Sequence, residues 1–198
     1  MKSHLIALGL VLSLLMIGQI VRGGEPQNIL ENAGFEDIKP YTVPEKWRGK
    51  IEATEVPKEW GINTTYPGKL TVIYDAITSH GGSKYIKLEK DKPRKTVALM
   101  GVGKNWMIPV SSGKKYLIKI WAKGEKKEKG SLTILAYGYS KKAFLKALSS
   151  EEMKVSPEWK EYKFEFTPFE GMVSTTIAFH VKGIVYLDDA YFAPLPTE

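Results

Sequence analysis

The chain contains no cysteine and few histidines. Its 198 residues include 0 cysteines and 3 histidines, of which His4 lies near the N-terminus. The lack of cysteine excludes disulfide bonds, a thiolate nucleophile and a lipid anchor attached through cysteine. His80 and His180 are the two histidines in the rest of the chain, which is too few for a metal centre built on three histidines.

Signatures of several enzyme classes are also missing. The chain has no Gly-x-Ser-x-Gly elbow and no Gly-Lys-Ser/Thr phosphate loop, and Gly101-x-Gly103 lacks the third glycine of a dinucleotide site. A glycosidase needs two carboxylates about 5–10 Å apart across a cleft. Glu161 lies two residues before Lys163 and Glu165 two residues after it, a spacing typical of a solvated charged strand face. The sequence therefore predicts a non-catalytic protein with no catalytic residues.

The first residues resemble a secretory signal peptide. Lys2 precedes an apolar run from Leu5 to Val21, and Gly23-Gly24 follows it. We expect cleavage after Gly23, which makes 1–23 a signal peptide of a secreted or periplasmic protein. A retained membrane anchor is the alternative, because the run is nearly long enough to span a bilayer. Residues 24–198, about 175 in all, then form a single domain with no further membrane span.

The chain is basic, with a net charge of +7. Removing Lys2 and Arg22 with the signal peptide lowers this to +5. Much of the surplus lies in 123–130, where charges of both signs alternate between glycines, a pattern typical of a solvated hairpin loop. The sequence thus predicts no nucleic-acid partner. An acidic polysaccharide or an anionic envelope surface remains an alternative partner.

Hydrophobic residues alternate with polar ones through most of the chain after residue 68. This period of two predicts β-strands. The strands are expected at 70–74, 84–89, 96–102, 115–122, 131–139, 160–166, 173–181 and 184–192. Half-buried strands separated by Gly, Pro and Ser turns indicate an all-β, antiparallel two-sheet sandwich. At 141–153 the apolar spacing is instead helix-like, which predicts one short helix or a structured crossover.

Two segments near the ends of the predicted domain each place carboxylates beside apolar residues. Residues 28–37 read N-I-L-E-N-A-G-F-E-D, and residues 183–192 read G-I-V-Y-L-D-D-A-Y-F. Carboxylates at both ends of one domain indicate an oxygen-ligand metal site that ties the termini together. The segments resemble the "N-L-x-N-x-G-F-E" and "Y-L-D-D" ends of secreted carbohydrate-binding modules of the four/nine type, in the galactose-binding-like jelly-roll group.

The resemblance continues between these ends in the same order. The matching segments are Trp47, 75–88 with H-G-G-S-K-Y-I-K-L, 108–116 with I-P-V-S-S-G-K-K-Y, 120–124 with I-W-A-K-G and 156–162 with S-P-E-W-K-E-Y. They cover nearly the whole predicted domain. The resemblance implies a galactose-binding-like jelly roll, with Trp47 and Trp159 as buried framework residues.

The same resemblance implies one structural Ca²⁺ ion. Glu36 and Asp188 occupy the positions that ligate calcium in such modules, with Asp37 and Asp189 beside them and carbonyls of 81–83 completing the shell. Calcium takes six to eight oxygen ligands without a fixed spacing in the sequence. The alternative is that Glu36 and Asp188 accept backbone hydrogen bonds where the termini meet.

The predicted strands place several aromatic and polar side chains on outward faces. These candidate ligand-binding residues are Trp121, Tyr137, Tyr139 and His180, with Thr176 beside them. Sugars stack their C–H faces on aromatic rings and bind planar polar groups. If the strands share one sheet, they form a groove rimmed by aromatic rings. If another segment covers that face, the same rings form a secondary core.

Two turn-like segments offer a second candidate site. Trp60 lies close to Asn63, and Trp106 follows Asn105. Jelly-roll modules also bind through edge loops, so both tryptophans are candidate ligand-binding residues. The alternative is that they plug the ends of the sandwich.

These features predict a secreted, non-catalytic carbohydrate-binding module that binds a poly- or oligosaccharide by aromatic stacking. The alternative function is an envelope or extracellular structural domain that docks a protein partner through the same fold and binds no sugar.

Overall fold

The computed structural model describes residues 26–45, 50–63, 68–89, 96–127, 130–141 and 143–196. The predicted signal peptide and Trp47 lie outside these ranges. Among the described residues, no helix is both long enough and apolar enough to cross a membrane. The described residues include a short 3-10 helix of three residues, Gly103–Asn105.

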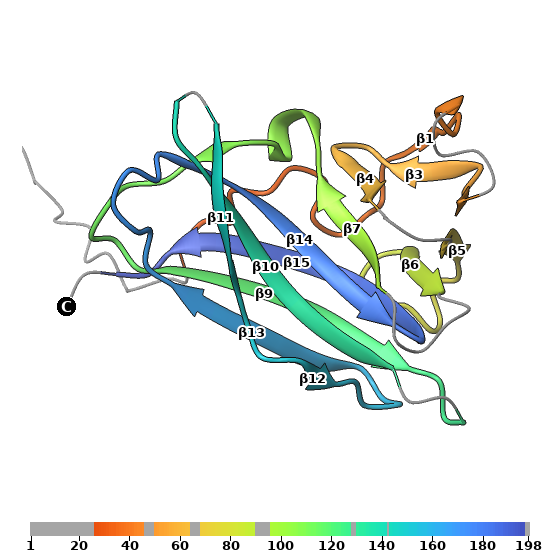
Figure 1. The fold of residues 1–198 in the computed structure, drawn as a ribbon. Coiled ribbons are helices and arrows are strands. Elements are labelled where there is room, and N and C mark those ends of the chain that lie inside the picture. The colour runs from red at the N-terminus through yellow and green to blue at the C-terminus, as the bar shows by residue number, and fades with distance from the viewer. Residues whose placement is uncertain are drawn as a thin grey trace, which may run out of the picture.

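Two large β-sheets form the two layers of a sandwich (Figure 1). The first has seven strands, five of them in the order β11-β10-β14-β7-β4, with β12 beside β10 and β8 beside β14. Its strands are β4 (Trp60–Asn63), β7 (Val97–Gly101), β8 (Ile108–Pro109), β10 (Ser131–Tyr139), β11 (Phe144–Ser149), β12 (Met153–Lys154) and β14 (Ser174–Lys182).

The second sheet has six strands in the order β13-β9-β15-β6-β5-β2. They are β2 (Ile51–Glu52), β5 (Gly68–Tyr74), β6 (Lys84–Glu89), β9 (Tyr116–Gly124), β13 (Lys160–Phe166) and β15 (Ile184–Pro194). Apart from the parallel pair of β2 and β5, neighbouring strands are antiparallel. The predicted all-β jelly-roll sandwich is confirmed.

The alternation of side chains explains how the two sheets bury one core. In β9, Tyr116, Ile118, Ile120 and Ala122 are buried and join the core cluster, while the residues between them are half-buried on the outer face. In β10, Leu132, Ile134 and Ala136 are buried in the same core. Successive side chains of a strand point to opposite faces, so every second residue faces the other sheet.

The stretch 141–153 is a place where the predicted element type is wrong, as is the turn-like segment at Trp60–Asn63, which forms strand β4. Residues Phe144–Ser149 form strand β11, paired with β10 at the edge of the seven-stranded sheet, and no helix forms within the described part of this stretch. Five of the six residues of β11 are exposed, so burial does not impose the alternation that marks the inner strands. Leu148 is the member of β11 that packs against the core.

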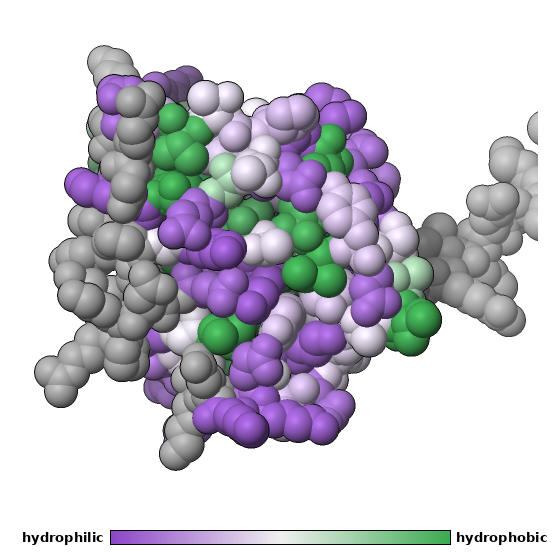
Figure 2. Space-filling model, turned by 90° about the vertical axis from the view of Figure 1, so that its right-hand side faces the viewer, coloured by the Kyte–Doolittle hydropathy of each residue, from purple (hydrophilic) through white to green (hydrophobic). Residues whose placement is uncertain are grey.

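A small sheet lies at one end of the sandwich. It pairs β1 (Ile38–Pro40) with β3 (Glu55–Pro57) in antiparallel fashion. Figure 2 views this end of the molecule and shows hydrophobic residues in separate groups among hydrophilic ones. The visible surface at this end is therefore not one continuous apolar patch of the kind that marks large protein interfaces.

Candidate functional site

Four aromatic rings meet on the outer face of the seven-stranded sheet. Tyr137 and Tyr139 alternate with buried residues of β10, and the edge strand β11 brings Phe144 opposite Tyr139. The ring centroid of Phe144 lies 6.0 Å from that of Tyr137 and 5.7 Å from that of Tyr139. Trp106, from the loop after the 3-10 helix, lies 5.5 Å from Tyr139. We call Trp106, Tyr137, Tyr139 and Phe144 the aromatic face.

The aromatic face remains accessible. Trp106 is 40% exposed and Phe144 is 52% exposed, whereas both tyrosines are half-buried. Ring surface left in contact with water is what a stacking ligand would cover. Phe144 was missed by the sequence reasoning, because it fell in the stretch predicted as a helix or crossover.

Polar groups lie beside the rings. The Tyr137 hydroxyl and Nε2 of His180 are 2.9 Å apart and form a hydrogen bond between β10 and β14. The backbone N–H of Met107 donates to the Thr176 hydroxyl at 3.0 Å, and Thr176 hydrogen-bonds to Tyr139. The sheet thus brings together Tyr137, Tyr139 and His180 as predicted, with Thr176 between them.

These polar groups are uncharged at neutral pH. Burial lowers the pKa of His180, which favours the neutral imidazole. Burial also raises the pKa of Tyr137 and of Tyr139, which keeps both phenols protonated. The site therefore presents neutral donors and acceptors beside apolar rings.

Trp121 does not belong to this site. It lies on β9, in the other sheet, with its side chain on the outer face. One face of its indole is covered by the imidazole of His80, with 3.7 Å between the centroids and 16° between the planes. The expected platform of Trp121 with Tyr137 and Tyr139 is therefore corrected, because the three residues lie on opposite sides of the sandwich.

The structure also separates Trp60 from Trp106. Trp60 is 0% exposed in the core, packs edge-on against Phe35, and donates its indole N–H to the carbonyl of Asn32. A ring without exposed surface cannot stack on a ligand, so its expected binding role is corrected in favour of the buried alternative. Trp106, by contrast, is part of the aromatic face.

The prediction of a buried framework position for Trp159 is wrong. This side chain is half-buried beside β13, and its indole N–H donates to the Thr78 carbonyl at 2.8 Å. It meets the Tyr85 ring edge-on at 5.7 Å. Its surroundings are the outer face of the six-stranded sheet instead of the core.

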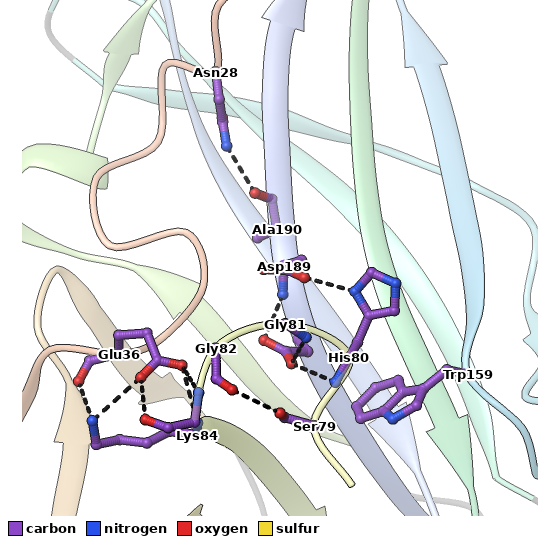
Figure 3. Close-up of polar contacts among 12 residues, drawn as sticks. Asn28, Glu36, Ser79, His80, Gly81, Gly82, Lys84, Trp159, Asp189 and Ala190 are labelled. Carbon is purple, nitrogen blue, oxygen red and sulfur yellow. Dashed lines mark hydrogen bonds and ion pairs between the residues drawn. The ribbon is translucent and has the colours of Figure 1, made fainter. Parts of the chain in front are cut away.

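The two terminal segments lie side by side, as their pattern predicted. The Asn28 side chain donates to the Ala190 carbonyl (Figure 3). It also accepts a hydrogen bond from the N–H of Phe192. The N–H of Ala190 in turn donates to the Ala33 carbonyl at 2.9 Å. The N-terminal segment is thereby tied to β15 by side-chain and backbone hydrogen bonds.

Glu36 reaches from this segment to the loop before β6. Its carboxylate accepts the backbone N–H groups of Ser83 and Lys84 at 2.6 and 3.0 Å, and the Ser83 hydroxyl at 2.7 Å. The Lys84 ammonium lies 3.3 Å from the same carboxylate and 2.9 Å from the Glu36 carbonyl (Figure 3). Burial disfavours the charge, yet these hydrogen bonds hold the pKa of Glu36 below its ordinary value.

Asp188 is held by the same loop. Its buried carboxylate accepts the backbone N–H groups of His80 and Gly81 at 3.0 and 3.1 Å, and that of Asp189 at 2.9 Å. Burial raises the pKa of Asp188 to about 6 despite these bonds. Asp189 turns the other way and lies 2.6 Å from Nδ1 of His80, the imidazole that covers Trp121 (Figure 3).

The residues around Glu36 and Asp188 do not fit a calcium ion as they are arranged. Glu36 accepts four hydrogen bonds, which matches the roughly four lone-pair sites of a carboxylate. Calcium needs oxygen lone pairs directed at it, and here N–H and O–H groups occupy those directions. Among the described residues, no group of three or more His, Asp or Glu side chains could hold a metal. Calcium binding by Glu36 and Asp188 stays a prediction.

Comparison with solved structures identifies the same fold in proteins of different activity. The carbohydrate-binding module TmCBM61, in complex with β-1,4-galactotriose, is 16% identical with a TM-score of 0.56, over 85% of this chain and 99% of that one. A cyclase from Fischerella sp. TAU is 12% identical with a TM-score of 0.60, over 88% of this chain and 100% of the cyclase. At such identities the likeness shows the fold alone.

Some matching structures are much longer than this protein. The enzymatically active domain of bacteriophage CBA120 tailspike protein 4 is 12% identical with a TM-score of 0.58, and the match covers 85% of this chain but 21% of the tailspike chain. No curated protein sequence matches the chain. The family model described as "Carbohydrate binding domain" (CBM_4_9), however, matches residues 27–190. The chain therefore belongs to the CBM_4_9 family of carbohydrate-binding domains.

Proposed function

We propose that this protein is a secreted, non-catalytic carbohydrate-binding domain whose aromatic face binds a neutral poly- or oligosaccharide. Family membership supports carbohydrate as the ligand class. The observation that carries the assignment of the site is the group of four rings on the outer face of the seven-stranded sheet, two of them 40% and 52% exposed.

The chemistry of the aromatic face suits a neutral sugar. Trp106 and Phe144 offer ring surface for the C–H face of a pyranose, which stacks favourably on aromatic rings. The Tyr137 hydroxyl and His180 supply uncharged hydrogen-bonding groups for sugar hydroxyls. Binding in this proposal is reversible and leaves the sugar unchanged. Secretion rests on the signal-like segment at 1–23.

Binding of the purified protein to a glycan array, followed by titration calorimetry, tests this proposal. β-1,4-Galactotriose is the first soluble probe, because TmCBM61 is solved with that ligand. Trp106→Ala should weaken binding about tenfold, which corresponds to ~1.4 kcal/mol. Ile77→Ala is the matched control, since Ile77 is 94% exposed in the loop between β5 and β6 and should leave affinity unchanged.

Two outcomes would count against the proposal. A blank array with a folded protein would favour the alternative, a structural domain that docks a protein partner. Equal affinities of the Trp106→Ala and Ile77→Ala variants would place the sugar away from the aromatic face.

A further inference from the structure

The six-stranded sheet carries a separate pocket on its outer face, on the other side of the sandwich from the aromatic face. Its volume is about 600 Å³. Tyr85 of β6, Lys123 of β9 and Tyr186 of β15 line it. These three strands are neighbours, and in each the lining residue alternates with residues of the buried core. The floor is therefore part of the sheet and does not depend on a loop.

The Lys123 ammonium lies in the middle of aromatic rings. It is 4.8 Å from the centroid of Tyr85, 4.6 Å from that of Trp159 and 5.4 Å from that of Tyr186. It donates a hydrogen bond to the Thr78 carbonyl at 3.0 Å. Burial lowers the pKa of Lys123, as expected for a cation that has lost part of its water. An ammonium carries three N–H donors, so an acceptor entering the pocket would find donors beside the rings.

The charged residues that line the pocket are mostly cationic. Lys126 and Lys127 join Lys123 in the lining, against the single carboxylate of Glu125. The Tyr186 hydroxyl donates a hydrogen bond to Glu125, so this carboxylate is already bound by a residue of the pocket wall. The lining thus carries a positive surplus of charge, and Lys123 also interacts with the carboxylates of Asp75, Glu158 and Asp188, which lie outside the lining.

We propose that this pocket is a second carbohydrate site, specific for a uronic acid residue of an acidic oligosaccharide. The Lys123 ammonium would pair with the sugar carboxylate, and charge-assisted hydrogen bonds of this kind are the stronger ones. Pro157 and Ile184 supply apolar wall for the C–H face of the sugar. The volume falls within the range of roughly 300–1,000 Å³ found for small-molecule sites. This site goes beyond the proposed function, and the observations that support it do not depend on the aromatic face.

The test compares trigalacturonate with β-1,4-galactotriose by titration calorimetry on the purified protein. Trigalacturonate should bind, and raised salt should weaken its binding because the interaction is between charges. Lys123→Met keeps the length of the side chain and removes the charge, and should weaken trigalacturonate binding about tenfold. Lys163→Met is the control, since Lys163 is an exposed lysine of β13 that does not line the pocket.

A second variant keeps the test sound if Lys123→Met does not fold. The double substitution Lys126→Gln with Lys127→Gln changes two exposed side chains and should weaken binding several-fold. A lack of trigalacturonate binding, or trigalacturonate binding that is unchanged by all the lysine variants, would overturn the second site. Loss of trigalacturonate binding on Trp106→Ala alone would overturn it too, while supporting the aromatic face as the sugar site.

Discussion

The hydroxyl of Tyr137 and Nε2 of His180 form a hydrogen bond of 2.9 Å across strands β10 and β14. In the register of these strands Tyr137 lies opposite Thr176, and His180 lies opposite Thr133, so the bond runs diagonally over the sheet. It links the ring-bearing strand to the central strand on the face proposed for sugar binding. The half-buried imidazole is uncharged there, because burial lowers its pKa.

The lowered pKa of His180 predicts that this residue contributes less to the stability of the protein in mild acid. The unfolded chain binds a proton at His180 near the ordinary pKa of about 6.5, whereas the folded chain resists it. Stability from this residue is therefore fully present above about pH 6.5 and falls as the pH drops towards the folded pKa. Urea titrations between neutral and mildly acidic pH should show this slope, and His180→Gln should reduce it.

Tyr137→Phe is the control for that measurement. It removes the hydroxyl that contacts His180 but leaves the imidazole buried under the same ring. Because burial is the cause of the pKa shift, the acid slope should persist in this variant. A slope that is the same in the protein and in His180→Gln would assign it to other groups.

Trp60 and Trp106 should differ sharply when each is replaced by alanine. Trp60 is 0% exposed and contacts Phe35 and Phe179, so Trp60→Ala leaves a large cavity and should cost about 3–5 kcal/mol of unfolding free energy. Trp106 is 40% exposed, and its replacement should cost about 1 kcal/mol. Chemical denaturation measures both. A small loss for Trp60→Ala would contradict its position in the core.

The strands and their inner faces could be predicted because alternation is a local property. Tyr116, Ile118 and Ile120 are read as one face from neighbouring letters alone, and that face is the buried one. The sheet to which a strand belongs is not local. Trp121 and Tyr137 both face outward, but the order of strand pairing places them on different sheets, which no pattern within either strand reveals.

Side chains on edge strands, and side chains that meet from distant segments, also could not be placed from the sequence. Among the strands that the structure describes, β11 pairs with β10 alone, so its exposed side chains carry no alternation and Phe144 could not be assigned to the aromatic face. The outer pocket was missed for a related reason. Tyr85, Lys123 and Tyr186 come from three segments far apart in the sequence, and they meet because β6 and β9 both pair with β15.

Gly82 should be hard to replace, because its backbone and its surroundings both require glycine. Its φ is +65°, and a Cβ at this position would collide with the Glu36 carboxylate. Gly113 is the matched control, with a φ of +78° and nothing within 4 Å of the Cβ position. Gly113→Ala should cost about 1–2 kcal/mol from backbone strain alone. Gly82→Ala should cost clearly more in thermal denaturation, and equal losses would contradict the close contact with Glu36.

The Lys84 ammonium contacts Glu36, one of the two residues that the family resemblance predicts to ligate calcium. Its ammonium lies 2.9 Å from the Glu36 carbonyl and 3.3 Å from the carboxylate, so the protein supplies its own positive charge there. The melting temperature tests the calcium prediction: if these contacts persist in calcium, the Tm is the same in calcium and in chelator. Lys84→Met should lower stability by about 1 kcal/mol, because a partly exposed carboxylate loses its charged partner but keeps its hydrogen bonds to Ser83 and to the Lys84 backbone. A Tm that rises in calcium for the unmodified protein would instead support a structural calcium at Glu36 and Asp188.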